Sequence, residues 1–335
     1  MTPMRPRRGS RPAQAGAALL TAMVIVALIA TLATSMIWQQ WRAVQVEAAE
    51  RARTQSAWIL SGALDWARLI LREDARNGGT DDLGEPWAVP LAEARLSTFL
   101  AADSSNTDDA PDAFLSGAIT DAQARYNLTN LVNGGQIDPL EMATLQRLCE
   151  TIGVSDDVAA TIAAGMRDAT PVAPPSPSAS GVPPPAATPP PPANPPLLPR
   201  SVSQLGWFGI DAETLRTVEP YVVILPEKTF VNVNTASREV LVAAVAGLDL
   251  ATAERILQSR QRTPLKSAAD LRALVPSLPA TSFNHIAVGS NFFEVRGRLR
   301  LGEVVLEQRS LVQRRGLDVF VLQRERVASR DLPNT

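Results

Sequence analysis

The feature that most constrains this chain is a run of 21 residues without a charge, from Ala17 to Ile37. As a helix that rises about 1.5 Å per residue, such a run spans about 30 Å, the thickness of a bilayer's hydrocarbon core. A secretory signal has a shorter apolar stretch, of about 7 to 15 residues, followed by a cleavage site with small residues. The run therefore predicts a transmembrane helix that is kept in the mature protein.

The helix is expected to continue well beyond the membrane. Between Ala17 and Asn77 there is no proline, and Gly62 is the one glycine. After residue 37 the pattern becomes amphipathic, since apolar residues such as Trp41 and Val44 recur at spacings near three, four and seven. Arginines before the span and acidic residues in the rest of the chain predict a cytoplasmic N-terminus and a body on the opposite side of the membrane.

The composition argues against a catalytic role. Among 335 residues, Cys149 is the only cysteine and His285 the only histidine. These counts exclude an intramolecular disulfide, and they remove most zinc sites, Ser-His-Asp triads and Cys-His dyads. We therefore expect a protein that is not an enzyme and requires no cofactor, with Cys149 as a small buried residue on the apolar face of a helix.

Residues 73 to 116 are rich in turn-forming residues, around a short helix predicted from Val89 to Leu100. Four aspartates in this stretch offer the oxygen ligands that Ca²⁺ prefers, although the spacing of an EF-hand is absent. A solvated acidic loop is the alternative interpretation, and the sequence favours it. The four aspartates are Asp103, Asp108, Asp109 and Asp112.

Two helical pairs are predicted further along, on either side of a proline-rich stretch. The first pair is expected at residues 138–152 and 155–166, with Asp138 and Ser155 as start signals. Residues 171 to 199 hold 14 of the 27 prolines and no charge, so they cannot form a packed core. A tolerated insertion is favoured there over a docking site for a proline-binding partner.

The second pair is predicted from residues 234–261, with a cap at Asn234-Thr-Ala-Ser237, an end at Gly247 and a new helix from Asp249. The same pattern resembles the helix-hairpin-helix of competence-type DNA receptors. In such a hairpin, backbone N–H groups of a glycine-rich turn contact phosphate. Here the second glycine is missing and Asp249 lies where phosphate would bind, and the body is acidic. The sequence therefore favours a packed α-domain over DNA binding.

The C-terminal part reads as β-structure. From Phe293 to Leu301, apolar residues alternate with Glu294 and three arginines, which predicts a half-buried strand. Two further strands are expected at residues 303–314 and 317–326, joined by a turn at Arg315-Gly316. These strands are expected to pair with an earlier strand around Ala118 and to pack on the N-terminal helix.

The N-terminus resembles the class III signal of type IV pilins and pseudopilins. A basic leader ends at Gly16, and an uncharged helix follows from Ala17 without a break. The resemblance implies that a membrane peptidase cleaves between Gly16 and Ala17 on the cytoplasmic side, with methylation of the new N-terminus. Family members usually have a glutamate at the fifth mature position, but this chain has Thr21. A carboxylate in the membrane is costly unless it is neutralised by a neighbouring subunit, so Thr21 indicates an end position in an assembly.

Two internal motifs resemble general secretion pathway protein K, a minor pseudopilin of type II secretion systems. The segment Asp121-Ala-Gln-Ala-Arg125-Tyr-Asn127-Leu-Thr-Asn-Leu131 is similar to its D-x-Q-G-R-F-N-L-N-x-L signature, with Ala124 and Tyr126 as departures. Arg125 is expected to form a structural ion pair. The second motif is the phrase around Asn232-Val-Asn234-Thr235. The resemblance allows calcium, but the acidic segment expected after Arg167-Asp168 is replaced by prolines.

The resemblance implies an α+β fold: a long N-terminal transmembrane and amphipathic helix packs on an antiparallel pilin-like sheet, which carries a large inserted all-α domain. The insert would contain two helix-hairpin-helix or SAM-like parts. The expected divisions are a leader at 1–16, a transmembrane helix at 17–37, pilin-like helix and first strands at 38–132, the insert at 133–285 with its proline-rich loop at 171–199, and C-terminal strands at 286–329.

By this resemblance the protein would sit in the bacterial inner membrane and at the tip of the pseudopilus, and would help to initiate assembly and protein export. Its implied partners are the I-type and J-type minor pseudopilins, the major pseudopilin, the prepilin peptidase, the inner-membrane platform and secreted cargo, with no nucleic acid. A membrane-anchored DNA receptor and a generic periplasmic scaffold are the alternatives. The predicted helix assembly face comprises Leu20, Val24, Leu28, Trp41 and Val44.

Overall fold

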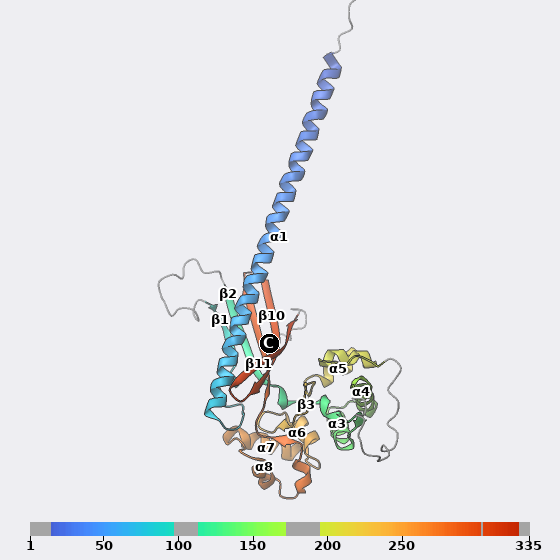
Figure 1. Cartoon of the computed structure of the whole chain (residues 1–335), viewed down its shortest axis with the longest axis vertical. Coiled ribbons are helices and arrows are strands. Elements are labelled where there is room, and N and C mark those ends of the chain that lie inside the picture. Colours follow the sequence, from blue (N-terminus) through green and yellow to red (C-terminus); the bar gives the residue numbers. More distant parts are fainter. Residues whose placement is uncertain (1–14, 97–112, 172–194, 303, 328–335) are drawn as a thin grey trace, which may run out of the picture. The chain divides into compact units, whose positions relative to one another are not determined.

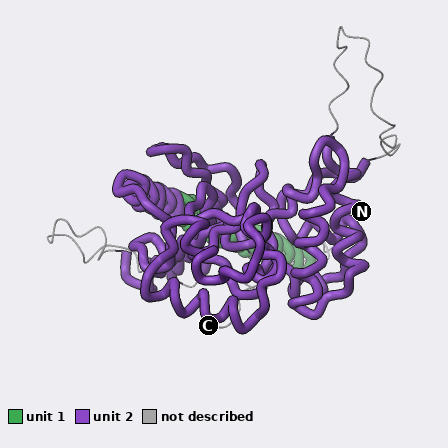
Figure 2. The backbone as a smooth tube through the Cα atoms, turned by 90° about the horizontal axis from the view of Figure 1, so that it is seen from below, with its two compact units in different colours: residues 1–58 green, residues 59–335 purple. Residues whose placement is uncertain are grey.

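The structure is a computed structural model that describes residues 15–96, 113–171, 195–302 and 304–327. The chain forms two compact units, residues 1–58 and 59–335 (Figure 2). A single helix, α1 (Ala15–Asn77), supplies all the described residues of the first unit and the first element of the second. The predicted continuous helix is therefore confirmed, and the absence of proline explains its length.

In the first unit, the side chains of α1 are exposed all round from Ala17 to Arg51. The large apolar side chains between Leu19 and Ile37 are 56–67% exposed. A helix that is apolar on every side is stable only in an apolar environment, and this one is long and apolar enough to cross a membrane. A bilayer is an environment that would supply the apolar surroundings which the protein itself does not provide in this segment.

The second unit is built on a five-stranded antiparallel sheet with the order β1-β2-β9-β10-β11 (Figure 1). The strands are β1 (Leu91–Arg95), β2 (Ala113–Asp121), β9 (Phe292–Leu301), β10 (Val304–Arg315) and β11 (Asp318–Val327). The three predicted C-terminal strands are confirmed, as is their pairing with the strand around Ala118, which lies opposite Arg296. Gly302 and Gly316, both with φ of +58°, form the turns.

One face of the sheet packs on the second half of α1. Because side chains alternate along a strand, Phe293, Val295 and Leu299 of β9 point to the same face. Leu60, at the beginning of the second unit, packs with Leu299. Closer to the end of the helix, Leu71 packs with Phe293. This helix-on-sheet layer is the expected pilin-like core.

The helix predicted at Val89–Leu100 is wrong from Val89 to Arg95, and residues 97–100 lie outside the described residues. A short 3₁₀ turn, η1 (Pro86–Ala88), is followed by Pro90 and then by strand β1. Proline disfavours helix at the residue before it, and pairing with β2, in which Ala94 lies opposite Leu115, fixes the extended conformation. Tertiary pairing has overridden a local helical pattern.

A largely helical region connects the end of β2 at Asp121 to the start of β9 at Phe292, which is wider than the 133–285 expected for the insert. The two helical pairs share one hydrophobic core. The α-helices are α3 (Pro139–Thr151), α4 (Asp156–Ala169), α5 (Ala212–Val218), α6 (Arg238–Ala244), α7 (Leu250–Arg262) and α8 (Ala268–Leu274). The 3₁₀ turns are η2 (Ala122–Ala124), η3 (Leu128–Leu131), η4 (Val202–Phe208) and η5 (Ala280–Phe283).

Short ladders join segments of this region that are distant in sequence. Strand β3 (Tyr126–Asn127) pairs in parallel with β6 (Val222–Val223), and β7 (Val231–Asn232) pairs in parallel with β8 (Ile286–Ala287). A small hairpin is formed by β4 (Val132–Asn133) and β5 (Gln136–Ile137).

The predicted helix starts are confirmed by their side-chain caps. Asp138 caps α3, Ser155 caps α4 and Ser237 caps α6, each by accepting from backbone N–H groups of the first turn. Most of the proline-rich stretch, residues 172–194, lies outside the described residues.

Candidate functional site

The predicted cleavage site lies at the beginning of α1. Gly16 and Ala17 belong to its first turn, and the leader before Ala15 lies outside the described residues. The hydroxyl of Thr21 donates to the backbone carbonyl of Ala17 and makes a longer contact of 3.3 Å with that of Ala18. This hydroxyl therefore has its hydrogen-bond partner within its own helix. Thr21 carries no charge and needs no polar partner from a neighbouring subunit.

The five residues of the predicted assembly face are all exposed, at 57–66%. Leu20, Val24 and Leu28 follow one another at four-residue intervals and form one stripe. At about 3.6 residues per turn, Trp41 and Val44 lie further round the helix than this stripe. The assembly face stays a prediction, and it divides into a membrane stripe and a separate pair beyond the membrane.

The two internal motifs meet at one buried junction between the sheet and the helical region. Its centre is Asp121, at the end of β2, whose Oδ2 accepts hydrogen bonds from the hydroxyls of Ser290 and Thr235 (both 2.6 Å) and from the side-chain amide of Asn232 (2.9 Å). Its Oδ1 accepts from the backbone N–H of Gln123 (2.7 Å). Burial raises the pKa of Asp121, and these four donors oppose the rise.

The rest of the first motif holds the segment between β6 and β7. The side-chain amide of Asn127 donates to the Glu227 carbonyl (2.8 Å), and its oxygen accepts from the Leu225 N–H (3.1 Å). Asn130 does the same with the carbonyl (2.8 Å) and the N–H (3.1 Å) of Thr229. Each buried amide bonds one backbone carbonyl and one backbone N–H of this segment, which a neighbouring strand would otherwise have to pair.

The second motif contributes two more buried amides. Asn232, fully buried, also donates to the Asp81 carbonyl (3.0 Å), which connects the loop after α1 to the junction. Asn234 bonds both the carbonyl and the N–H of Leu265, each at 2.9 Å. Together the two motifs tie the sheet, the loop after α1 and both halves of the helical region through groups that are almost all paired.

Arg125 forms the predicted structural ion pair. Its guanidinium donates to Glu294 of β9 at 3.0 Å. Arg296 (2.7 Å) and Arg309 (3.2 Å) approach the same carboxylate, although the Nε of Arg309 lacks the alignment of a hydrogen bond. Burial by itself would raise the pKa of Glu294, but Arg125, Arg309 and Arg296 outweigh it, so this pKa is lowered.

The hairpin between α6 and α7 lacks the features of a phosphate-binding turn. Gly247 has φ of +87° and ends the first helix. The carboxylate of Asp249 accepts from the Thr252 N–H (2.8 Å), so the first turn of α7 already has its anion. This hydrogen bond, together with that from the Thr252 hydroxyl, lowers the pKa of Asp249. Arg260 is buried and donates to the Val233 carbonyl, inside the protein.

Cys149 and His285 serve the core of the helical region. Cys149 is completely buried, as expected, and burial raises the pKa of its thiol to about 11, so the thiol stays protonated. The Nδ1 of His285 lies 2.8 Å from Glu141, whose carboxylate also accepts from the Tyr126 hydroxyl at 2.9 Å. This arrangement is a satisfied polar cluster and shows no nucleophile.

The predicted calcium ligands Asp103, Asp108, Asp109 and Asp112 lie outside the described residues. Asp168, beside the proline-rich stretch, is paired with Arg167 at 2.8 Å. Within the described residues, Asp74, Asp81 and Glu85 bring carboxylate oxygens to within 4.8 Å of one another. Arg314 occupies the first two of these carboxylates, at 2.6 Å each.

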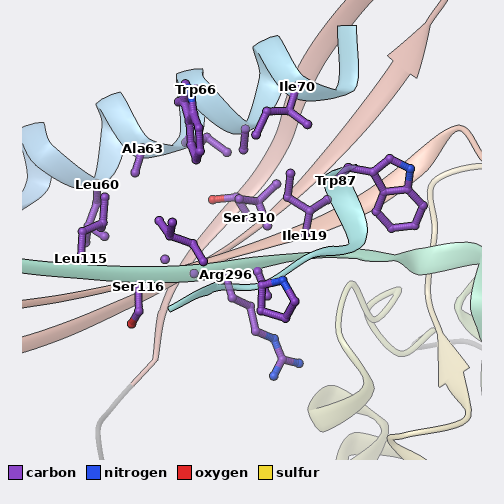
Figure 3. Close-up of a pocket in the computed structure, with 18 of the residues that line it drawn as sticks. Leu60, Ala63, Trp66, Ile70, Trp87, Leu115, Ser116, Ile119, Arg296 and Ser310 are labelled. Carbon is purple, nitrogen blue, oxygen red and sulfur yellow. The ribbon is translucent and has the colours of Figure 1, made fainter. Parts of the chain in front are cut away.

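An apolar cavity of about 270 Å³ lies between α1 and the sheet (Figure 3). Leu60, Trp66 and Ile70 line it from the helix, and Trp87 forms part of its wall. Its floor contains Gly117 and Gly297, which lie directly opposite each other on β2 and β9. The cavity exists because this pair places no side chains under the helix.

Two family models described as "Type II secretion system (T2SS), protein K" match the chain, over residues 124–227 and 231–287. A type II secretion system protein K from Klebsiella pneumoniae is 30% identical over 329 residues, which cover 93% of this chain and 96% of that protein. The chain belongs to the protein K family. Proteins of the same name from Pectobacterium carotovorum and Pseudomonas aeruginosa are 29% and 28% identical, over 94% and 88% of this chain and 97% and 86% of their own lengths.

The solved structure of the GspK–GspI–GspJ complex from enterotoxigenic Escherichia coli contains a similar fold. The TM-score is 0.64 at 22% identity, with 84% of this chain and 99% of that chain covered. Together with the family, this likeness identifies the chain as a minor pseudopilin of the type II secretion system, with the expected α+β architecture. A protein of this family is a structural component of secretion.

Sequence reasoning found both motifs but missed the residues that complete the junction. Asp81 and Ser290 lie in loops, 151 and 58 positions from Asn232, and neither belongs to a recognisable pattern. The one available signal was the phrase Asn232-Val-Asn234-Thr235, because alternating asparagines in a short apolar segment are unusual unless their amides have buried partners.

Proposed function

We propose that this protein K caps the tip of the pseudopilus. The observation that carries the proposal is Thr21, whose hydroxyl is bonded to its own helix, so that no carboxylate is available at the fifth mature position. A subunit inside a pilus shaft would use such a carboxylate to pair with the N-terminal ammonium of a neighbour. A subunit at the end of the filament has one neighbour fewer and does not need that pair.

The fold of the second unit supports an end position. Leu60 packs near Leu115, at the beginning of β2, whereas Leu71 packs near Ile119, close to its end. The helical region leaves the sheet after Asp121, and therefore at the end of the sheet where α1 finishes. Bulk at that end of the sheet can cover the end of a filament.

We further propose the processing and orientation that the pilin-like N-terminus implies. A prepilin peptidase would cut between Gly16 and Ala17, and the new N-terminus would be methylated. The leader would lie in the cytoplasm and the body in the periplasm, as the arginine-rich leader indicates. The uncharged helix from Ala17 then anchors the subunit in the inner membrane.

The proposed partners follow from the family and from the solved complex, which contains a GspK with a GspI and a GspJ. We assign the I-type and J-type minor pseudopilins as direct neighbours, and the major pseudopilin, the secretion platform and secreted cargo as further contacts. The protein acts without catalysis, a calcium requirement or nucleic acid in this proposal. The Asp249 cap and the buried Arg260 support the last point.

Immunogold labelling of pseudopili in a strain that overproduces the major pseudopilin tests the tip position. Wild-type protein should be found at one end of each filament. Thr21→Glu restores the carboxylate of a shaft subunit and should move part of the label into the shaft. Thr54→Glu, in which the charge is added beyond the uncharged span, is the matched control and should leave the label at the end. Wild-type label along the whole shaft would contradict the proposal.

Mass spectrometry of the membrane-extracted chain tests the processing. The mature protein should begin at Ala17 and carry one methyl group. Gly16→Val should leave the leader in place, because the residue next to the cut bond is then β-branched and larger, whereas Gly9→Val should still be processed. A mature chain that retains Met1, or one cut after residue 30, would refute the pilin-like processing.

A further inference from the structure

Three carboxyl groups and one guanidinium meet where α1 ends. Oxygens of Asp74, Asp81 and Glu85 all lie within 4.8 Å of one another. Arg314 of β10 donates to Asp74 (2.6 Å) and to both oxygens of Asp81 (2.6 and 2.7 Å). The side chains of Arg314, Asp74 and Asp81 are 11%, 12% and 5% exposed, so this charge cluster is largely shielded from water.

Glu85 holds a buried aromatic residue in place. Its Oε2 accepts from the Trp87 indole N–H (2.6 Å) and from the Asp82 backbone N–H (3.0 Å). Trp87 is 1% exposed and meets the ring of Phe293 edge to face, with 5.2 Å between ring centres. The same indole forms part of the wall of the apolar cavity (Figure 3). The Glu85 side chain thus fixes the segment 81–88 against the sheet.

The charges around Glu85 do not balance when every acid is ionised. Asp74 faces it from α1, Asp81 and Asp82 from its own loop, and Arg314 from β10. Arg314 binds Asp74 and Asp81, and the Asp82 carboxylate accepts from the Gly84 N–H (2.7 Å). Of the three clustered carboxyl groups, those of Asp74, Asp81 and Glu85, the Glu85 group is the one whose hydrogen bonds include no cation.

We propose that Glu85 is a proton-dependent latch: with its carboxyl protonated, the segment Asp81–Ala88 and the Trp87 wall of the cavity stay closed on the sheet, and loss of the proton loosens them. A proton removes one of several like charges that lie close together in a poorly hydrated site. The geometry explains why a single proton has a local effect, since one side chain links the acidic cluster to the buried indole.

The direction of the pH effect follows from proton binding. Burial raises the pKa of Glu85 from 4.5 to about 7, with Asp74 and Asp81 adding to the rise and the hydrogen bonds from Asp82 and Trp87 opposing it. If Glu85 has its ordinary pKa of 4.5 in the open form and a pKa of about 7 in the closed form, the closed form binds more protons than the open form between pH 4.5 and 7. Stability of the closed form decreases as pH rises from 4.5 through 7, and changes little further above 7.

Hydrogen–deuterium exchange of the full-length protein in detergent tests the latch. Corrected for intrinsic rates, exchange of residues 78–90 should be about tenfold faster at pH 8 than at pH 5.5, as expected when closed and open states differ in pKa by more than one unit. Glu85→Gln cannot lose a proton and its amide oxygen still accepts from Trp87, so its exchange should be equally slow at both values. Glu93→Gln, at an exposed ion pair with Arg300, should behave as the wild type.

A wild-type ratio near one, or the same ratio in Glu85→Gln, would overturn the proposal. Asp74→Asn gives a second test if Glu85→Gln does not fold, since it removes one neighbouring charge and should reduce the pH effect. Calcium chloride added at pH 8 distinguishes a site that binds a proton from a site that binds a metal ion. If calcium slows exchange in the wild type but not in Glu85→Gln, the cluster is a metal site and the latch is refuted. If calcium has no effect while the pH effect persists, the latch is supported.

Discussion

The first half of α1 and the motif junction place their side chains in opposite environments. In α1, apolar side chains such as Leu20 and Leu28 are 66% and 57% exposed. At the junction, polar side chains such as Asp121 and Asn232 are at most 5% exposed. The helix requires apolar surroundings from outside the chain. The junction requires hydrogen-bond partners from inside the chain, in one geometry.

The difference shows how the two regions can fail. We expect the helix to tolerate changes that keep it apolar and uncharged, because no side chain among the described residues packs against its exposed apolar part. The junction tolerates few changes, because each missing atom leaves a buried donor or acceptor without a partner. Four experiments, from the largest expected effect to the smallest, test this contrast.

The largest effect is expected at the centre of the junction. Asp121→Ala removes the acceptor of Ser290, Thr235 and Asn232, and should destabilise the second unit by about 3 to 5 kcal/mol. Urea unfolding followed by near-ultraviolet circular dichroism in detergent measures it. Asp318→Ala, at a side chain that is 70% exposed, is the control and should change stability by less than about 0.5 kcal/mol. Equal losses of stability in both variants would show that the buried hydrogen bonds of the junction do not stabilise the second unit.

A charge placed in α1 tests the opposite side of the comparison. Leu28 and Leu69 are both 57% exposed in the protein alone. Leu28→Arg should cost about 2.5 to 3.5 kcal/mol of membrane insertion, because residue 28 lies at the centre of the uncharged span. Leu69→Arg should leave insertion unchanged. Alkaline extraction of membranes followed by blotting distinguishes them, and equal extraction of the two variants would show that residue 28 does not lie in lipid.

The glycine pair under α1 offers a smaller and more local test. A Cβ at Gly117 would lie 2.6 Å from the Arg296 carbonyl oxygen, whereas one at Gly297 would lie 3.2 Å from a methyl group of Leu60, beside the cavity. Gly117→Ala should therefore destabilise by about 1 to 3 kcal/mol. Gly297→Ala should stabilise by about 0.4 to 1 kcal/mol, because Leu60 has room to move and the unfolded chain loses freedom. Thermal melts show which variant is the more stable. An equal loss of stability in both would contradict this account of the cavity.

The smallest effect concerns the helical hairpin. Asp249→Ala removes the cap of α7 and should cost about 1 kcal/mol. The same variant tests whether Asp249 alone prevents DNA binding, since its loss uncovers the Thr252 N–H. We expect no DNA retention at low salt for either the wild type or the variant, because Arg260 is buried. Salt-sensitive retention of the wild type would revive the DNA-receptor alternative.

Local signals in the sequence predicted the helix, its caps and the C-terminal strands. Asp138, Ser155 and Ser237 were recognisable because a cap acts on the next three residues. The alternation in β9 was recognisable because the period of a strand is two. The segment after Val89 was predicted wrongly, because whether Leu91–Arg95 forms a strand depends on its pairing with β2, whose partner residues lie 19 to 26 positions away.

The sequence by itself determined that this chain forms one uninterrupted helix long and apolar enough to cross a membrane, because charge and proline act locally and both are absent over the required length. It also determined the absence of a charge at Thr21. Only the tertiary structure decided that Asp121, Asn232 and Ser290 form one buried junction, and that Glu85 faces Asp74 and Asp81. The physical reason is distance along the chain: hydrogen bonds and charges between remote residues depend on how the backbone returns, and no local pattern encodes that return.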